Sequence, residues 1–194
     1  YFVSDTHYSH QNIIRYSGRP FASVHEMDEK MIENHNKIVK SGDTVWHLGD
    51  FAFCNFESFK KILSRLNGDI HLILGNHDKM ILQNTREILQ QGKIKSIQSY
   101  KEIYVQDKMF VLFHYGQRVW NKSHYGSIHL YGHSHGSLPP QGLSVDVGVD
   151  CREIVCANGT NKTPEEYRPI HEDEILKYMT NRQSTVVDHH GAKE

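Results

Sequence analysis

The stretch IHLILGNHD, residues 70–78, joins a short apolar run to polar side chains of the types that can bind metal ions or phosphate. Residues 70–74 have the composition and length of a buried β-strand. When such a strand ends directly in polar residues, those residues lie in the loop at the carboxyl end of the strand. The stretch therefore predicts an α/β fold with functional side chains at the ends of strands.

The same arrangement recurs on both sides of this stretch. Four more short segments carry ligand-type side chains, and each follows an apolar run. Any one of them would be common by chance, but five in a fixed order indicate a metal centre. The four are Asp5-Thr6-His7, Gly49-Asp50, His114 and Gly132-His133-Ser134-His135.

Strands and helices alternate through the first half of the chain. This alternation predicts a largely parallel sheet covered by helices, in which the crossovers gather the ligand loops along one edge. Ser23 and Glu26 form a capping-box pattern that marks the first long helix. The expected strands are residues 1–3, 44–48 and 70–74, and the expected helices are residues 24–39, 56–66 and 80–91.

The second half of the chain reads as a series of strands, which predicts a second, mixed sheet packed face to face on the first. The expected fold class is thus α/β, a two-sheet β-sandwich flanked by helices. We expect one domain over residues 1–180 and a polar, mobile tail over residues 181–194. The later strands are residues 97–106, 109–113, 127–131 and 144–149, followed by a helix over residues 172–179.

The charge balance points to a local site rather than a charged surface. The 194 residues carry 22 Lys and Arg against 23 Asp and Glu, for a net charge of -1. Extended nucleic acid is therefore not an expected partner. The unusual number is 15 histidines, because neutral imidazole is the commonest metal ligand and its pKa suits proton transfer near neutrality.

The cysteines bear on the cellular compartment. Cys54, Cys151 and Cys156 lack the spacing of a zinc site, and an odd number fits free thiols better than disulfides. The expected location is therefore the reducing cytoplasm. No stretch approaches the roughly 20 apolar residues of a membrane span, so no membrane partner is expected. The sequence does not indicate an oligomeric state.

The candidate ligands offer a mixture of oxygen and nitrogen donors. Asp50 follows a glycine and has two carboxylate oxygens, which makes it the candidate bridge between two ions. The mixed set suits two divalent ions, with manganese expected and iron, zinc, cobalt or nickel as alternatives. Ions about 3.5–4 Å apart lower the pKa of a bridging water, whose hydroxide attacks phosphorus directly. The candidate metal ligands are Asp5, His7, Asp50, Asn76, His114, His133 and His135.

Four further residues are candidates for catalysis or substrate binding. His77 can face the phosphate, where it would stabilise the transition state or protonate the leaving group. Asp78 can either orient His77 or cap the following helix. His10 can reach the mouth of the pocket or lie in an exposed loop, and Arg118 can clamp phosphate or belong to an ordinary surface loop.

Together these segments resemble the calcineurin-like metallophosphoesterase superfamily, whose pattern runs D-x-H, G-D, G-N-H-D or E, H and G-H-x-H. The stretch DTHYSHQNII, residues 5–14, is also similar to small bacterial and phage phosphoesterases of this superfamily. The resemblance implies a two-sheet α/β sandwich. It also implies two sets of ligands that share Asp50, namely Asp5, His7, Asp50 and His135, and Asp50, Asn76, His114 and His133.

The expected function is hydrolysis of a small phosphomonoester or nucleotide-like phosphodiester. The sequence leaves the choice between monoester and diester open, because both present the same phosphorus to the same ions. One alternative is a nuclease that acts on nucleic-acid ends or single strands. Another is a binding scaffold of the same fold without activity, which the complete ligand set disfavours.

Overall fold

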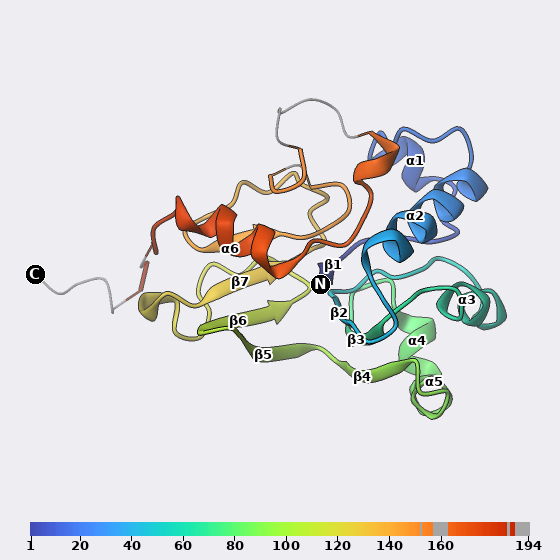
Figure 1. The fold of residues 1–194 in the computed structure, drawn as a ribbon, viewed down its shortest axis with the longest axis horizontal. Coiled ribbons are helices and arrows are strands. Elements are labelled where there is room, and N and C mark those ends of the chain that lie inside the picture. The colour runs from blue at the N-terminus through green and yellow to red at the C-terminus, as the bar shows by residue number, and fades with distance from the viewer. Residues whose placement is uncertain (152, 157–162, 186, 189–194) are drawn as a thin grey trace, which may run out of the picture.

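The computed structural model describes residues 1–151, 153–156, 163–185 and 187–188. Within these residues the chain forms two four-stranded sheets with helices around them (Figure 1). This arrangement confirms the predicted fold class, a two-sheet α/β sandwich flanked by helices.

The first sheet is parallel and contains the first four strands in sequence order, β1-β2-β3-β4. Helices connect these strands, as the alternating sequence pattern predicted. The strands are β1 (Phe2–Val3), β2 (Thr44–His47), β3 (Asp69–Ile73) and β4 (Ile94–Gln98), and the helices are α1 (Ile13–Tyr16), α2 (Val24–Ile38), α3 (Phe56–Leu63), α4 (Lys79–Gln83) and α5 (Thr85–Gln90).

The second sheet is mixed and has the order β5-β6-β7-β8. Strands β5 and β6 form an antiparallel hairpin, whereas β6-β7 and β7-β8 are parallel pairs. Its elements are β5 (Tyr100–Val105), β6 (Lys108–Phe113), the 3-10 helix η1 (Ser123–Tyr125), β7 (Ile128–Tyr131) and β8 (Ser144–Asp146), followed by the 3-10 helix η2 (Pro164–Glu166) and α6 (Glu172–Thr180).

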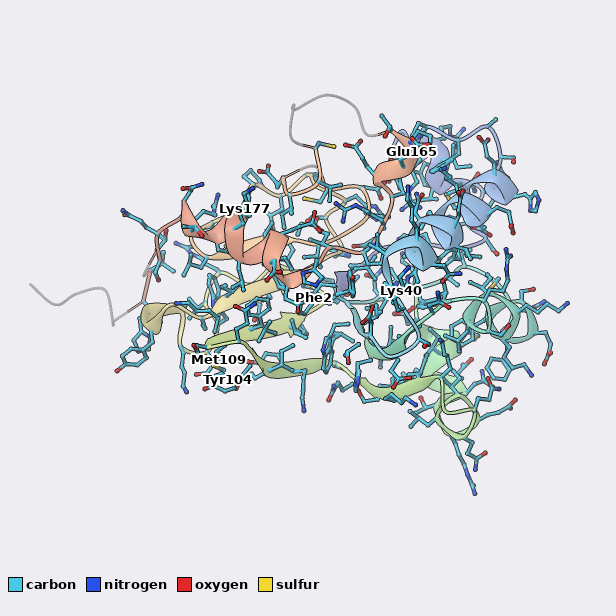
Figure 2. All side chains as sticks on the ribbon, in the orientation of Figure 1. Phe2, Lys40, Tyr104, Met109, Glu165 and Lys177 are labelled. Carbon is cyan, nitrogen blue, oxygen red and sulfur yellow. The ribbon has the colours of Figure 1, made fainter. Side chains whose placement is uncertain are left out.

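Alternate residues of the first sheet pack into two different cores. Val3 and Leu72 contribute to the core beneath α2 and α3, while Phe2 and Ile73 contribute to the core shared with the second sheet. Successive side chains of a strand point to opposite faces of the sheet, so neighbouring residues of the same strand pack into different cores. Phe2 lies near the middle of the molecule (Figure 2) and is 2% exposed.

The two sheets meet where β1 ends. The Ser4 amide donates to the Val147 carbonyl at 3.2 Å, and the Val149 amide donates to the Ser4 carbonyl at 3.0 Å. The first ligand loop therefore lies directly against the segment that follows β8. This contact joins chain segments that are far apart in sequence and positions the functional site.

Two of the predicted elements are each divided in two in the structure. The helix expected over residues 80–91 is broken at Asn84, whose side-chain amide donates to the Met80 carbonyl at 2.7 Å. Asn and Thr side chains compete for backbone hydrogen bonds and interrupt helices in this way. The strand expected over residues 97–106 is two strands, β4 and β5, which belong to different sheets.

The chain remains attached to the second sheet beyond residue 180, the expected end of the domain. Arg182 donates to the carbonyl oxygens of Pro140 and Gly142 at 2.9 and 2.7 Å, and the Ser184 hydroxyl donates to the Ser123 carbonyl at 2.6 Å. The expected mobile tail thus begins with packed residues, and residues 186 and 189–194 lie outside the described part. Among the helices that the structure describes, none has the length and apolar character needed to cross a bilayer.

Candidate metal centre

The ligand loops converge because they follow neighbouring strands. The Asp5 amide donates to the Gly49 carbonyl at 3.0 Å, and the His7 amide donates to the Asp50 carbonyl at 3.0 Å. These bonds continue the β1-β2 pairing past the ends of both strands. The Asp5-Thr6-His7 and Gly49-Asp50 segments therefore run side by side at the carboxyl edge of the first sheet.

The predicted ligands gather in two clusters. One is Asp5, His7 and His135, whose ligand atoms all lie within 4.8 Å of one another. The other is Asp50, His114 and His133, whose ligand atoms meet the same limit. Asn76 joins the second cluster, because its Oδ1 lies 3.0 Å from His114 Nε2 and 3.0 Å from His133 Nδ1.

Asp50 lies between the two clusters. Its Oδ2 atom is 3.6 Å from His7 Nε2 and 3.6 Å from His114 Nε2. Its Oδ1 atom accepts a hydrogen bond from the His77 amide at 2.9 Å. One carboxylate oxygen thus faces a histidine of each cluster, which is the position that a shared ligand requires.

The unsatisfied polar atoms show that this site suits cations. Both ring nitrogens of His7 are buried without a hydrogen-bond partner, which is costly unless another group uses them. Burial lowers the pKa of His7, so its ring is in the neutral form that binds metal. Burial and the neighbouring Asp146 raise the pKa of Asp5 to about 7, and a bound cation would stabilise the charged carboxylate.

The backbone at the ligands is unusual. Five of the seven predicted ligands have a left-handed conformation, with φ between 48° and 66°. This conformation is strained in residues other than glycine and costs about 1–2 kcal/mol each. The surrounding fold therefore holds the loops in turns that aim the side chains inward. The five are Asp5, His7, Asp50, His133 and His135.

The glycines of the motifs allow these loops to approach closely. A Cβ atom at Gly75 would lie 2.5 Å from the Asp50 amide nitrogen, and a Cβ atom at Gly132 would overlap the side chains of Ser4 and Asp5. Neither position has room for a side chain. The two glycines are thus required by packing against ligand residues rather than by a positive φ angle.

Arg19 and Asp150 support the first cluster, and neither residue was predicted from the sequence. Asp150 Oδ2 is 2.7 Å from His135 Nδ1, which leaves His135 Nε2 free to face an ion. Arg19 binds both oxygens of Asp150, at 2.9 and 2.7 Å, and also donates to the carbonyls of Asp5 and Thr6. The position of Asp150 after an apolar run was a usable signal, whereas nothing in the sequence singled out Arg19.

Asp78 neither orients the His77 ring nor caps α4, the two roles predicted from the sequence. Its two oxygens accept hydrogen bonds from the backbone amides of Asp50, Phe51 and Gly75, at 2.9, 2.9 and 2.8 Å. Its side chain makes no capping bond to α4. These bonds tie the second and third ligand loops together, so the observed contacts of Asp78 position the ligands rather than orient the His77 ring.

His77 and His10 lie at the open side of the centre. The exposed His77 ring is centred 5.6 Å from the His7 ring, so the structure brings it to the site. The His10 ring is centred 5.4 Å from the His7 ring, so the structure brings it to the site. Arg118 is exposed, and among the described residues no hydrogen bond or ion pair joins it to a predicted ligand.

His47 has a supporting role. It accepts a hydrogen bond from the Gly49 amide through Nδ1 at 3.2 Å, and its Nε2 lies 2.9 Å from the Thr6 hydroxyl. The hydroxyl donates to the Phe51 carbonyl at 2.7 Å. Burial lowers the pKa of His47 to about 3, so a neutral histidine links the first two ligand loops.

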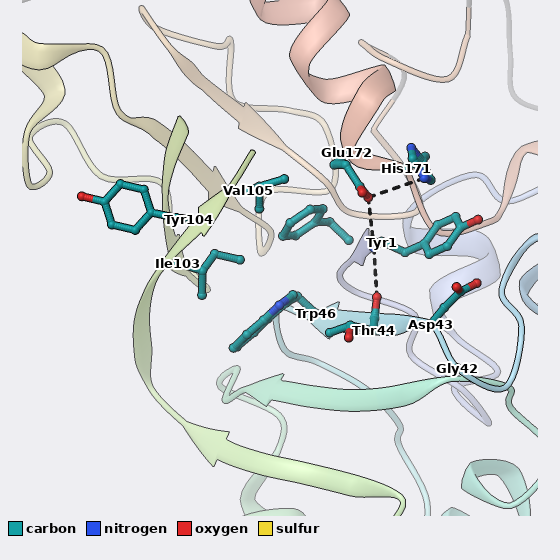
Figure 3. Close-up of a pocket in the computed structure, with 11 residues that line it drawn as sticks. Tyr1, Gly42, Asp43, Thr44, Trp46, Ile103, Tyr104, Val105, His171 and Glu172 are labelled. Atoms are coloured by element: carbon teal, nitrogen blue, oxygen red, sulfur yellow. Dashed lines mark hydrogen bonds and ion pairs between the residues drawn. The ribbon is translucent and has the colours of Figure 1, made fainter. Parts of the chain in front are cut away.

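A pocket of about 510 Å³ lies away from the predicted metal ligands (Figure 3). Its lining includes Tyr1, which precedes β1, Thr44 and Trp46 of β2, and His171 and Glu172 at the start of α6. The amino ends of β1 and β2 form part of its wall, whereas the ligand loops follow the carboxyl ends of these strands. This pocket is therefore separate from the candidate metal centre.

Fold and site together define a class of protein, a two-sheet α/β enzyme with paired metal-ligand clusters. The sequence profile of the calcineurin-like phosphoesterase superfamily domain matches residues 1–141. The chain belongs to this superfamily, as the resemblance in the sequence implied. The protein is therefore a phosphoesterase, a hydrolase of phosphoric esters.

The individual relatives do not identify a substrate. An uncharacterised protein of Methanocaldococcus jannaschii is 31% identical over 188 residues, which cover 92% of this chain and 90% of the relative. The crystal structure of a protein of unknown function from Aquifex aeolicus is similar with a TM-score of 0.64 and 26% identity, covering 91% and 97% of the two chains. An archaeal phosphodiesterase gives a TM-score of 0.49 at 20% identity, covering 82% and 86%.

Proposed function

We propose that the protein is a binuclear phosphoesterase that hydrolyses a small phosphate ester with two divalent ions, preferably manganese. The observation that carries this proposal is the place of Asp50, whose Oδ2 lies 3.6 Å from a histidine nitrogen of each ligand cluster. A carboxylate so placed can bind two ions at once. The mixture of carboxylate, amide and imidazole donors fits manganese, and it also fits iron, zinc, cobalt or nickel.

The residues of the site have different roles in hydrolysis. Two divalent ions, when bound, supply positive charge that activates water and stabilises the attacking and leaving oxygens. One ion would be held by Asp5, His7 and His135, and the other ion would be held by Asn76, His114 and His133. Asp50 would bind both ions. His77 lies beside them and is free to donate a proton or a hydrogen bond to the phosphate. Asp150 and Asp78 keep the ligand loops in position.

A small substrate fits the charge distribution of the chain. The net charge of -1 gives no broad attraction for nucleic acid, so recognition depends on the metal centre. We therefore favour a phosphomonoester or nucleotide-like phosphodiester over a long nucleic acid. An inactive scaffold is disfavoured because each of the seven predicted ligands lies in or beside one of the two clusters.

The test combines metal removal with one ligand substitution. The protein is stripped with a chelator, reloaded with manganese, and assayed with matched phosphate monoesters and diesters. Activity should disappear on stripping and return on reloading. Asp50→Ala should lower activity more than about 100-fold, because loss of a residue that only orients a ligand already costs about 10–100-fold. Asp107→Ala, at an exposed carboxylate in the β5–β6 turn, is the control.

Metal content decides between the outcomes. Wild type and Asp107→Ala should bind two equivalents of manganese in a calorimetric titration, and Asp50→Ala should bind fewer or bind much more weakly. Equal turnover of stripped, reloaded and Asp50→Ala protein would refute the proposed function. A strong preference for diester or monoester identifies the substrate class.

A further inference from the structure

A pocket of about 570 Å³ opens beside His77. The loop after β2 contributes Phe53, and the loop after β3 together with α4 contributes His77, Lys79, Met80 and Gln83. Because the His77 ring is also centred 5.6 Å from the His7 ring, the pocket adjoins the metal centre. The metal-binding role of the nearby loops does not explain why the pocket exists.

Phe53 is the central feature of this pocket. Its side chain is 53% exposed, although a large aromatic ring is usually buried. Its ring stacks on His10 with a centroid separation of 4.5 Å and an interplanar angle of 22°. The Phe53 and His77 rings form a T-shaped pair, with a centroid separation of 5.8 Å and an interplanar angle of 68°. The fold thus presents a flat aromatic surface next to the candidate catalytic histidine.

The position of the pocket relative to Asp50 indicates which part of a substrate it meets. The His77 amide is held by Asp50 Oδ1 at 2.9 Å, so the backbone of His77 is fixed at the metal centre while its side chain remains exposed. A leaving group on the His77 side of the phosphorus would lie beside Phe53 and Met80, which line this pocket. The pocket therefore faces the alcohol portion of the ester.

The lining also indicates the chemistry of that group. Phe53 and Met80 offer apolar contact to a flat ring, while Lys79 and Gln83 can form hydrogen bonds with polar atoms on the edge of the ring. No carboxylate belongs to the described lining, so a ligand that carries phosphate meets no repulsion here. Stacking on an aromatic side chain is a common way to bind a nucleobase.

We infer that this pocket binds the leaving group of the substrate and selects phosphate esters of nucleosides. The inference rests on the proposed function, because it assigns a substrate class to the same site. In the reaction, the oxygen of water bonds to phosphorus and the bond from phosphorus to the nucleoside oxygen breaks. One proton of the water ends on that oxygen, and the products are a nucleoside and a phosphate.

The test uses substrates that differ only in the base. Adenosine 5′-monophosphate is compared with 1-O-methylribose 5-phosphate, and the methyl esters of both provide the diester pair. Wild type should prefer the adenosine compounds and release adenosine. Phe53→Ala should lower kcat/KM for them by about 10- to 100-fold, while the ribose compounds change less than about threefold. Phe53→Trp should restore the preference, and Tyr125→Ala, at an 80% exposed tyrosine, should leave it unchanged.

A binding measurement separates this inference from the proposed function. Saturation-transfer NMR compares adenosine with 1-O-methylribose on wild type, Phe53→Ala and Phe53→Trp, and it needs no turnover. Adenosine binding should be lost in Phe53→Ala and regained in Phe53→Trp. Equal binding by wild type and Phe53→Ala, or an equal loss of activity on all substrates, would overturn the inference. If no substrate is hydrolysed, the proposed function is refuted. The NMR comparison still shows whether the pocket binds adenosine.

Discussion

The substitution Asp150→Asn should destabilise the protein and weaken one metal site at the same time. Asparagine keeps the shape of the side chain but removes its charge. Asp150 is the only carboxylate that Arg19 contacts among the described residues, and it also holds the Nδ1 atom of His135. The substitution therefore leaves a buried guanidinium without its counter-ion and leaves His135 without its charged partner.

The structure sets the expected size of both effects. The Arg19 side chain is 0% exposed and that of Asp150 is 4% exposed. Removing one partner of a buried ion pair typically costs about 3–5 kcal/mol. Loss of a carboxylate behind a metal-binding histidine typically costs about 10–100-fold in metal affinity. We expect the free energy of unfolding to fall by the first amount and manganese affinity by the second.

A surface pair of the same geometry provides the control. Arg65 binds both oxygens of Glu29 at 2.6 and 2.7 Å, but the two side chains are 46% and 44% exposed. Exposed pairs contribute about 0–1 kcal/mol. Glu29→Gln should therefore change stability by less than about 1 kcal/mol and leave metal affinity unchanged.

Urea unfolding of the metal-free proteins and calorimetric titration with manganese measure the two effects separately. A stability loss for Asp150→Asn no larger than that of Glu29→Gln would refute the argument from burial. A wild-type manganese affinity in a folded Asp150→Asn protein would refute the role assigned to Asp150 behind His135.

Three other changes test different parts of the structure. His77→Ala should keep manganese binding in calorimetry and lower kcat by about 10²–10⁴-fold, as expected for a general acid; loss of metal binding would instead make it a ligand. Gly132→Ala should weaken manganese binding, because the added methyl group would overlap Asp5; unchanged titration would contradict this. His35 is neutral in the fold, since burial lowers its pKa from 6.5 to about 4. The contribution of neutral His35 to the free energy of unfolding should therefore be fully present above pH 6.5. Below that pH the unfolded chain binds a proton at His35, and stability should fall by up to roughly 3 kcal/mol towards pH 4. His35→Gln should show a smaller loss in urea unfolding across this range, and an identical pH profile would exclude His35 as the cause.

Several features of the fold could be predicted because their causes are local. The capping-box pattern of Ser23 and Glu26 precedes α2, and the Ser23 side chain accepts a hydrogen bond from the Glu26 amide at 3.1 Å. The apolar runs before Asp50 and Asn76 became β2 and β3. The segment from Ile97 to Gln106, by contrast, reads as one strand and gave no sign that the chain passes from one sheet to the other between β4 and β5.

The sequence by itself determined which residues could bind metal and where along the strands they stand, because a strand followed by a polar loop is a short-range pattern. Only the tertiary structure decided how these residues divide into two clusters around Asp50. It also paired Arg19 with Asp150 across 131 positions of the chain and exposed Phe53 beside His77. Such contacts depend on strand order and on left-handed turns at the ligands, and both are set by packing between segments that are far apart in the sequence.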